Sequence, residues 1–290
     1  MNARHAVFGG AAMLAALSAA GAWWEWRSAP RVVAVAALPA APPGAAAPDA
    51  NAAPLPIPPV PPRIADGPDY ERCLSMLASD PSGANAFADA WQATGGGDGA
   101  VHCQALAQIA LGEVATGADM LEKLANTSHA PDAARAAVYG QAGQAWLMAG
   151  DANRAYAAAS LALTLSPDDP DLLVDHSIAA ATLEKYQDAI DDLDRALDLD
   201  PRRTDALVYR GSAWRHVGQL ALAQDDIDRA LAIDPENADA LLERGILRER
   251  QGDRNGARQD WEHAIAAAPD TATSDLAQQN LALLEAGPAR

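Results

Sequence analysis

The fold is decided by residues 170–237, which read PDLLVDHSIAAATLEKYQDAIDDLDRALDLDPRR followed by TDALVYRGSAWRHVGQLALAQDDIDRALAIDPEN. Each half is 34 residues long and places similar residues at the same steps. The same spacing continues beyond this stretch on both sides, because Pro167, Pro201, Pro235 and Pro269 are each 34 residues apart. A fixed period of this length is typical of repeat architectures, in which each unit packs on its neighbours.

Four further series of residues keep the same period, and each series keeps one residue size. They are Ala155, Ala189, Ala223 and Ala257; Ala162, Ala196, Ala230 and Ala264; Gly143, Ser177, Gly211 and Gly245; and Leu163, Leu197, Leu231 and Ile265. Small residues let two helices cross closely, ridge into groove. Proline ends a helix because it lacks the amide donor. The unit is therefore predicted to be a pair of helices.

These residues resemble the tetratricopeptide repeat family, whose unit has small residues at positions 8, 20 and 27 and proline at position 32. Numbered in this way, four repeats occupy 136–169, 170–203, 204–237 and 238–271. The resemblance implies an all-α fold, a right-handed superhelical solenoid of helix hairpins. Glycine stands at the reversal of the first, third and fourth repeats, as a C-cap residue does. Glu184 replaces it in the second repeat, where a less tight turn is expected.

The repeats are predicted to lie between a helical subdomain at 68–135 and a C-terminal capping helix and tail at 272–290. Helices are expected at about Asp69–Leu77, Ala84–Gln92, Ala100–Leu111, Gly117–Ala125 and, as the cap, Asp275–Glu285. Ala105 and Gly117 are twelve residues apart, as positions 8 and 20 would be, but His129 stands where proline is expected. Whether this pair is a degenerate fifth repeat stays open. Trp146, Trp214 and Trp261 are expected between the helices of their repeats.

Residues 1–27 have the features of an export segment of a bacterial protein. Arg4 and the α-amino group precede Ala6–Trp24, a run without formal charge, which fits a signal sequence. Ala20-Gly21-Ala22 offers a cleavage pattern, but as a helix the run would span roughly 28 Å, enough for an uncleaved anchor. The folded part is expected in the periplasm in both cases, either anchored on the periplasmic side of the inner membrane or soluble.

Residues 28–67 contain 11 of the 20 prolines and are predicted to be a disordered Pro/Ala-rich linker. Cys73 and Cys103, the chain's two cysteines, follow it. An exported chain with an even cysteine count usually pairs them, so a disulfide is predicted. Two buried free thiols or a metal site are the alternatives, and no second ligand motif completes a metal shell.

Charge and motifs exclude several classes of function. Residues 1–67 hold three of the chain's 39 acids and four of its 21 bases, which leaves 36 acids and 17 bases in residues 68–290. Such a body repels nucleic acid. The six histidines are scattered and no catalytic motif is present, so neither an enzyme nor a cofactor is expected. Asp188, Asp191, Asp192 and Asp194 are interpreted as a solvated helix face.

The resemblance also implies a partner-binding groove, lined in this family by positions 2, 5, 9, 12 and 13 of the first helices. Transferred to this chain, these positions give an apolar strip and a small basic corner. The strip is Leu147, Met148, Val174, Ile178, Val208, Leu242 and Ile246, and the corner is Arg215, His216 and Arg250. The Lys and Asn with which some members bind acidic C-termini are absent from positions 5 and 9.

Such a groove suits an amphipathic helix or an extended peptide with apolar anchors, unless the N-terminal helices or the cap cover the strip. The sequence thus predicts a protein–protein interaction scaffold in the cell envelope, with a protein or peptide as its partner. Only the N-terminal segment would contact a membrane. A periplasmic assembly or biogenesis chaperone that holds client polypeptides is the alternative, and a cell-wall enzyme with an unrecognised site is a third.

Overall fold

The computed structural model describes residues 62–286, and within them the chain forms thirteen α-helices and no strand. The predicted export segment and residues 28–61 of the linker lie outside the described part. The helices are α2 (Pro68–Met76), α3 (Pro81–Ala93), α4 (Gly97–Ala110), α5 (Val114–Thr127), α6 (Asp132–Met148), α7 (Ala152–Leu165), α8 (Pro170–Thr182), α9 (Tyr186–Leu199), α10 (Thr204–His216), α11 (Leu220–Ile233), α12 (Ala238–Arg250), α13 (Arg254–Ala267) and α14 (Ala272–Ala286).

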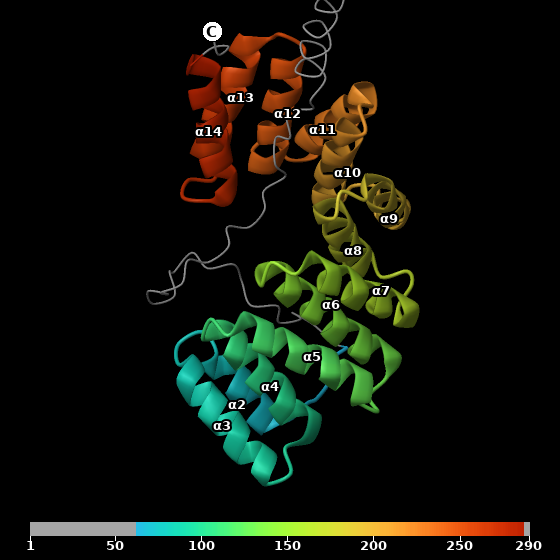
Figure 1. Cartoon of the computed structure of the whole chain (residues 1–290), viewed down its shortest axis with the longest axis vertical. Coiled ribbons are helices and arrows are strands. Elements are labelled where there is room, and N and C mark those ends of the chain that lie inside the picture. The colour runs from blue at the N-terminus through green and yellow to red at the C-terminus, as the bar shows by residue number, and fades with distance from the viewer. Residues whose placement is uncertain (1–61, 287–290) are drawn as a thin grey trace, which may run out of the picture. The chain divides into compact units, whose positions relative to one another are not determined.

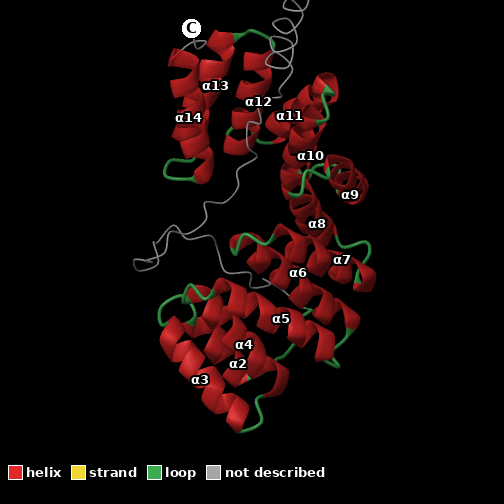
Figure 2. Cartoon of the chain, in the orientation of Figure 1, coloured by secondary structure: helices red, strands yellow, loops and turns green. Residues whose placement is uncertain are grey.

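Helices that follow one another in the chain pack against one another, and short turns join them into hairpins (Figures 1 and 2). The hairpins α6–α7, α8–α9, α10–α11 and α12–α13 coincide with the four sequence repeats, and α14 packs on the last of them. The predicted fold class, an all-α solenoid of tetratricopeptide-type helix hairpins, is confirmed. Among residues 62–286, no helix is long and apolar enough to cross a membrane.

Small residues at positions 8 and 20 bring the two helices of a hairpin close together. A Cβ atom added to Gly245 would lie 2.3 Å from Nε1 of Trp261, and one added to Gly211 would lie 2.9 Å from Cδ1 of Ile227. The α4–α5 hairpin has the same crossing, because a Cβ on Gly117 would lie 2.5 Å from the carbonyl oxygen of Ala105. The pair left open as a degenerate repeat therefore shares this geometry with the others.

The reversal inside each hairpin is equally tight in all four repeats, which corrects the expectation for Glu184. Gly150, Gly218 and Gly252 have φ values of 80°, 80° and 87°, and Glu184 takes the same left-handed region at 60°. The amide of Glu184 donates to the carbonyl of Ala181 at 3.0 Å, as that of Gly150 donates to the carbonyl of Leu147. Packing of the flanking helices thus forces a non-glycine residue into a conformation that it disfavours.

Helix starts differ from the sequence expectation where capping and composition extend them. Helix α6 begins at Asp132, directly after Pro131 and four residues before the predicted start of the first repeat, because the alanine-rich segment between them favours helix. Helix α3 begins at Pro81 rather than Ala84, since the carboxylate of Asp80 accepts a bond from the amide of Gly83 at 2.8 Å.

The tryptophans lie near the cores of their hairpins, as expected. Trp146 and Trp261 are buried, and Trp214 is partly buried against the core of the last three repeats. The indole of Trp146 donates to Glu122 at 3.0 Å, and the guanidinium of Arg154 lies 3.6 Å from its ring centroid. These contacts join α5, α6 and α7.

A buried polar pair recurs at positions 7 and 23 of the last three repeats. The pairs are His176 with Asp192, Arg210 with Asp226, and Arg244 with Asp260, at 2.5 to 2.7 Å. The first repeat has alanine at both positions, Ala142 and Ala158. The interpretation of the aspartates of α9 as a solvated face is therefore wrong for Asp192, which is buried, whereas Asp188, Asp191 and Asp194 are exposed.

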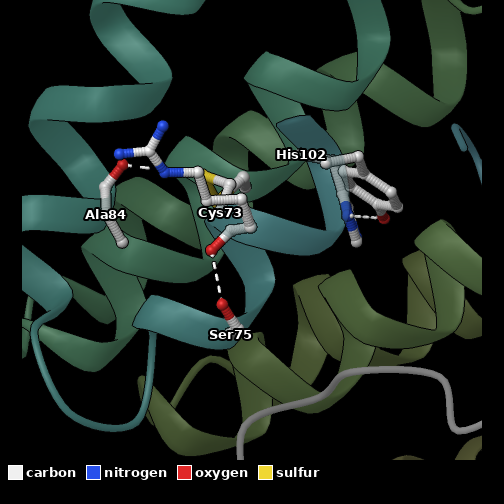
Figure 3. The surroundings of a disulfide bond; sticks show 7 residues. Cys73, Ser75, Ala84 and His102 are labelled. Carbon is white, nitrogen blue, oxygen red and sulfur yellow. Dashed lines mark hydrogen bonds between the residues drawn. A yellow bond between two sulfur atoms is a disulfide. The ribbon is translucent and has the colours of Figure 1, made fainter. Parts of the chain in front are cut away.

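The N-terminal helices are joined by a disulfide and a chain of buried side chains (Figure 3). Cys73 of α2 and Cys103 of α4 form the disulfide, with their Cα atoms 6.2 Å apart. Beside it, the hydroxyl of Tyr70 donates to Nδ1 of His102 at 2.6 Å, and Nε2 of His102 donates to the Gln141 amide oxygen at 2.8 Å. Burial lowers the pKa of His102 to about 4, so its imidazole is neutral at pH 7.

Replacement of Glu184 by glycine is expected to raise the free energy of unfolding by about 0.5–1 kcal/mol, because glycine adopts the left-handed region without strain. Urea unfolding measures the change. Gly218→Ala, at the equivalent position of the next repeat, is the matched control. No atom would lie within 4 Å of its new Cβ, so its expected loss of about 1 kcal/mol comes from the backbone alone. A loss of stability in Glu184→Gly would contradict the argument.

Asp226→Ala is expected to lower the free energy of unfolding by about 3 kcal/mol, because it leaves the partly buried Arg210 without its bidentate partner. The double variant Arg210→Ala and Asp226→Ala reproduces the alanine pair of the first repeat and should recover part of this loss. Thermal and urea unfolding of both variants measure the difference. Equal losses in the single and double variants would show that the pair contributes through packing rather than charge.

Candidate partner-binding face

The candidate site lies on the first helices of the repeats, α6, α8, α10 and α12. We call the side chains at positions 2, 6, 9, 12 and 13 of these helices the first-helix face. The site predicted from the sequence used positions 5, 9, 12 and 13. Its role in binding stays a prediction, but the structure shows which of its side chains a partner could reach.

Position 5, which supplies three of the seven residues of the predicted apolar strip, is not open to a partner. Val174, Val208 and Leu242 are buried. At the same position of the first repeat, a Cβ added to Gly140 would lie 2.6 Å from Cδ2 of Leu172 in the next first helix. Position 5 thus lies where consecutive first helices pack, and its side chains belong to the core.

The other four residues of the strip differ in their exposure. Ile246 is buried, whereas Ile178 is only partly buried against the core of the last three repeats. Leu147 and Met148 are partly buried against the core of the N-terminal half. Three of the seven predicted apolar residues therefore keep surface that a partner could contact.

The predicted basic corner is largely neutralised. Arg215 is 2% exposed, and its guanidinium donates to both carboxylate oxygens of Glu243, at 2.8 and 3.1 Å. His216 stacks on Tyr186 with ring centroids 4.4 Å apart, and burial together with the charge of Arg215 lowers its pKa to about 4. Arg250 alone is exposed, so the corner presents one free charge rather than three.

Position 6, which the sequence prediction did not use, contributes to the face. Position 9 of one repeat bonds position 6 of the next: the Gln144 amide donates to Asp175 at 2.9 and 3.1 Å, and the Ser212 hydroxyl donates to Glu243 at 3.1 Å. Between the second and third repeats, the equivalent residues are Ile178 at position 9 and Tyr209 at position 6. Tyr209 is 39% exposed, a large fraction for an aromatic side chain.

Charged groups of three repeats act on Tyr209. Partial burial raises its pKa to about 12, the charges of Asp239, Asp205 and Asp175 act in the same direction, and the charge of Arg203 acts in the opposite one. Burial also raises the pKa of Asp175 to about 7, against a smaller opposite effect of the hydrogen bond from Gln144. Among the described residues, the amide of Gln144 is the one side chain that bonds this carboxylate.

The sequence did contain a signal for two of these acids, Asp205 and Asp239. Together with Asp171 they are spaced by 34 residues and occupy position 2 of the second to fourth repeats. In residues 62–286, no group of three or more His, Cys, Asp and Glu side chains is placed to hold a metal ion. The face is thus a polar and aromatic surface rather than the apolar strip expected from the sequence.

Replacement of Asp175 by asparagine should change how stability depends on pH. The folded-state pKa of Asp175 is raised from 3.8, so its contribution to stability is present below pH 3.8 and is lost as the pH rises to about 7. The folded-state pKa values of His102 and His216 are lowered from 6.5, so their contributions are lost as the pH falls towards 4. Between pH 4 and 6.5, a rise in pH therefore lowers the stability contributed by Asp175 and raises the stability contributed by the two histidines.

Asp175→Asn should therefore gain stability more steeply with pH in this window than the unmodified protein. At pH 7.5 it should exceed that protein by about 1–3 kcal/mol, because the buried charge is gone while the bond to Gln144 can remain. Urea unfolding at pH 4.5, 6.0 and 7.5 measures both effects. Asp228→Asn, exposed on α11, changes the net charge equally and should leave the profile unchanged. An unaltered profile in Asp175→Asn would contradict the buried-charge argument.

Comparisons with known proteins support the fold. No family model and no curated protein matches the chain. A solved structure, the APC/C hetero-tetramer Cut9-Hcn1, matches with 17% identity and a TM-score of 0.56, over 73% of this chain and 42% of that one. The chain thus spans less than half of that structure's length.

Two smaller solved structures match with lower scores. YrrB, described as a TPR protein with an unusual peptide-binding site, has 22% identity and a TM-score of 0.49, over 67% of this chain and 97% of that one. MamA has 19% identity and a TM-score of 0.48, over 56% of this chain and 93% of that one. At these identities, the similarity to Cut9-Hcn1 establishes the helical-repeat fold and extends no further than the fold.

Proposed function

We propose that this protein is a non-enzymatic interaction scaffold of the bacterial cell envelope, which binds a peptide or helix of one partner protein on its first-helix face. The observation that carries the proposal is the exposure of Tyr209 on a helix whose other large apolar residues are mostly buried. Large aromatic side chains on a surface are typical of protein-binding sites, where they supply rigid contact area.

Neighbouring side chains extend this surface along three repeats. Ile178 of α8 is partly exposed, and Leu147 and Met148 of α6 are also accessible in part. Each first helix contributes only a few such residues, so a partner would have to contact several repeats at once. Repeat proteins bind extended segments in this way.

Two features support a location outside the cytoplasm. The Cys73–Cys103 disulfide is typical of exported proteins, because cytosolic thiols are kept reduced. The charge pattern of residues 1–27 fits an export signal or an anchor, which would hold the repeats on the periplasmic side of the inner membrane.

The proposal predicts one discrete partner in the cell of origin. Photo-reactive residues would be placed at Ile178 and Tyr209, and as a control at Leu222, which is 47% exposed on the second helix α11. One adduct of defined mass from the first two positions and none from Leu222 supports a dedicated partner. Many adducts from all positions support the holding of client polypeptides instead. Adducts from Leu222 alone would place the binding surface on the second helices.

A further inference from the structure

The first-helix face carries acids along its edge, and most of them have a structural role. Asp171, Asp205 and Asp239 lie in the first turns of α8, α10 and α12, where the helix dipole favours negative charge. Arg203 bridges two of them, 2.6 Å from Asp171 and 2.9 Å from Asp205. These acids alone therefore indicate no ligand.

Tyr209 differs from these acids because its side chain has no ion pair or hydrogen bond within residues 62–286. It is the exposed aromatic residue in the middle of the face, and none of the hydrogen bonds found within residues 62–286 involves its hydroxyl. Asp205 lies four residues before it on α10, one helical turn away, while Asp175 and Asp239 lie on the preceding and following first helices, α8 and α12. Negative charge around an aromatic ring makes a good environment for a cation and a poor one for an anion.

Asp175 is the second residue that the fold leaves without a strong partner. Its carboxylate is partly buried and bonded by a neutral amide, while Arg203 acts on it only at longer range. In the third and fourth repeats, the buried acids Asp226 and Asp260 each have an arginine at 2.7 Å. A positive group arriving from outside would give Asp175 the partner that those two acids find within the fold.

Resting on the proposed function, we infer that the partner segment is basic and that it places a lysine or arginine side chain over Tyr209. The aliphatic stem lies against the ring and the exposed part of Ile178, and the charge faces Asp175, Asp205 and Asp239. A cation over a tyrosine face and an ion pair with a poorly solvated carboxylate both contribute to such a contact.

The charge of the whole body favours the same partner. Residues 68–290 carry 36 acids against 17 bases, which attracts positively charged segments and raises their rate of encounter. On the face itself, Arg215 is paired with Glu243, and Arg250 is the exposed cation of the predicted corner. Arg203 also acts on Tyr209, but it is paired with Asp171 and Asp205. An acidic segment would therefore meet the exposed Arg250 and the carboxylates of Asp175 and Asp239, which have no arginine or lysine partner among the described residues.

Binding of synthetic peptides to the purified protein tests the inference. The probes are fluorescein-labelled peptides of one leucine and alanine framework, with lysine, glutamine or glutamate at the same four positions. Fluorescence anisotropy at 0.15 M salt should show saturable binding of the lysine peptide only. Tyr209→Ala should weaken it about tenfold, and Tyr209→Phe, which keeps the ring, should not.

A matched pair of double variants separates the local contact from general attraction. Asp205→Asn with Asp239→Asn removes two charges from the face, and Asp225→Asn with Asp228→Asn removes two exposed charges from α11. The first should weaken binding several-fold more than the second, with circular dichroism confirming that both fold. Equal weakening by the two, or no effect of Tyr209→Ala, overturns the inference.

Failure of the inference can be told apart from failure of the proposed function. If the adduct formed at Ile178 or Tyr209 in the cell contains a partner segment without lysine or arginine, the scaffold function stands and the basic partner does not. If these positions yield no discrete adduct, the scaffold function itself fails.

Discussion

The close crossing of two helices at positions 8 and 20 is the constraint on which the rest of this fold depends. Where Gly245 meets Trp261, or Gly117 meets the carbonyl of Ala105, a single methyl group would overlap its neighbour. Because the helices cross so closely, the turn between them has little freedom. Glu184 is held in a left-handed conformation for this reason, although a glycine would adopt it more easily.

The same close packing decides where polar groups are buried. Two helices in such contact place positions 7 and 23 opposite each other, and different repeats have different residue pairs at these positions. Alanine fills it in the first repeat, a histidine–aspartate pair in the second, and arginine–aspartate pairs in the third and fourth. An apolar and an ionic pair of suitable size are often of similar stability. The fold can therefore accept either at the same position.

The repeats could be located from sequence because their determinants are local. Small residues, turn glycines and prolines act within one hairpin, and their 34-residue spacing fixed the register of α6 to α13. The start of α6 could not be placed in this way, since residues 132–135 belong to no repeat position. Asp192 carried a readable signal, because it lies between Ala189 and Ala196 on the buried side of α9.

The candidate site was harder to predict because it depends on contacts between repeats. Whether position 5 is exposed is determined by the next first helix, and the packing of Leu172 over Gly140 is not visible in the spacing. The charge of Arg215 is matched by Glu243, 28 residues later in another repeat. The periodic acids at position 2 could have been found from the same 34-residue spacing that identified the prolines.

The contrast among the buried acids bears most directly on function. Asp226 and Asp260 are bonded by arginines of their own hairpins, so their charges are compensated within the fold. Asp175 is bonded by the neutral amide of Gln144 instead of an arginine. Because burial raises its pKa to about 7, its charge opposes folding at neutral pH. Groups whose ionisation is disfavoured by the fold are concentrated at functional sites, although structural networks also contain them. Here the group lies next to an exposed aromatic side chain on the first-helix face, and this combination favours a binding role over a structural one.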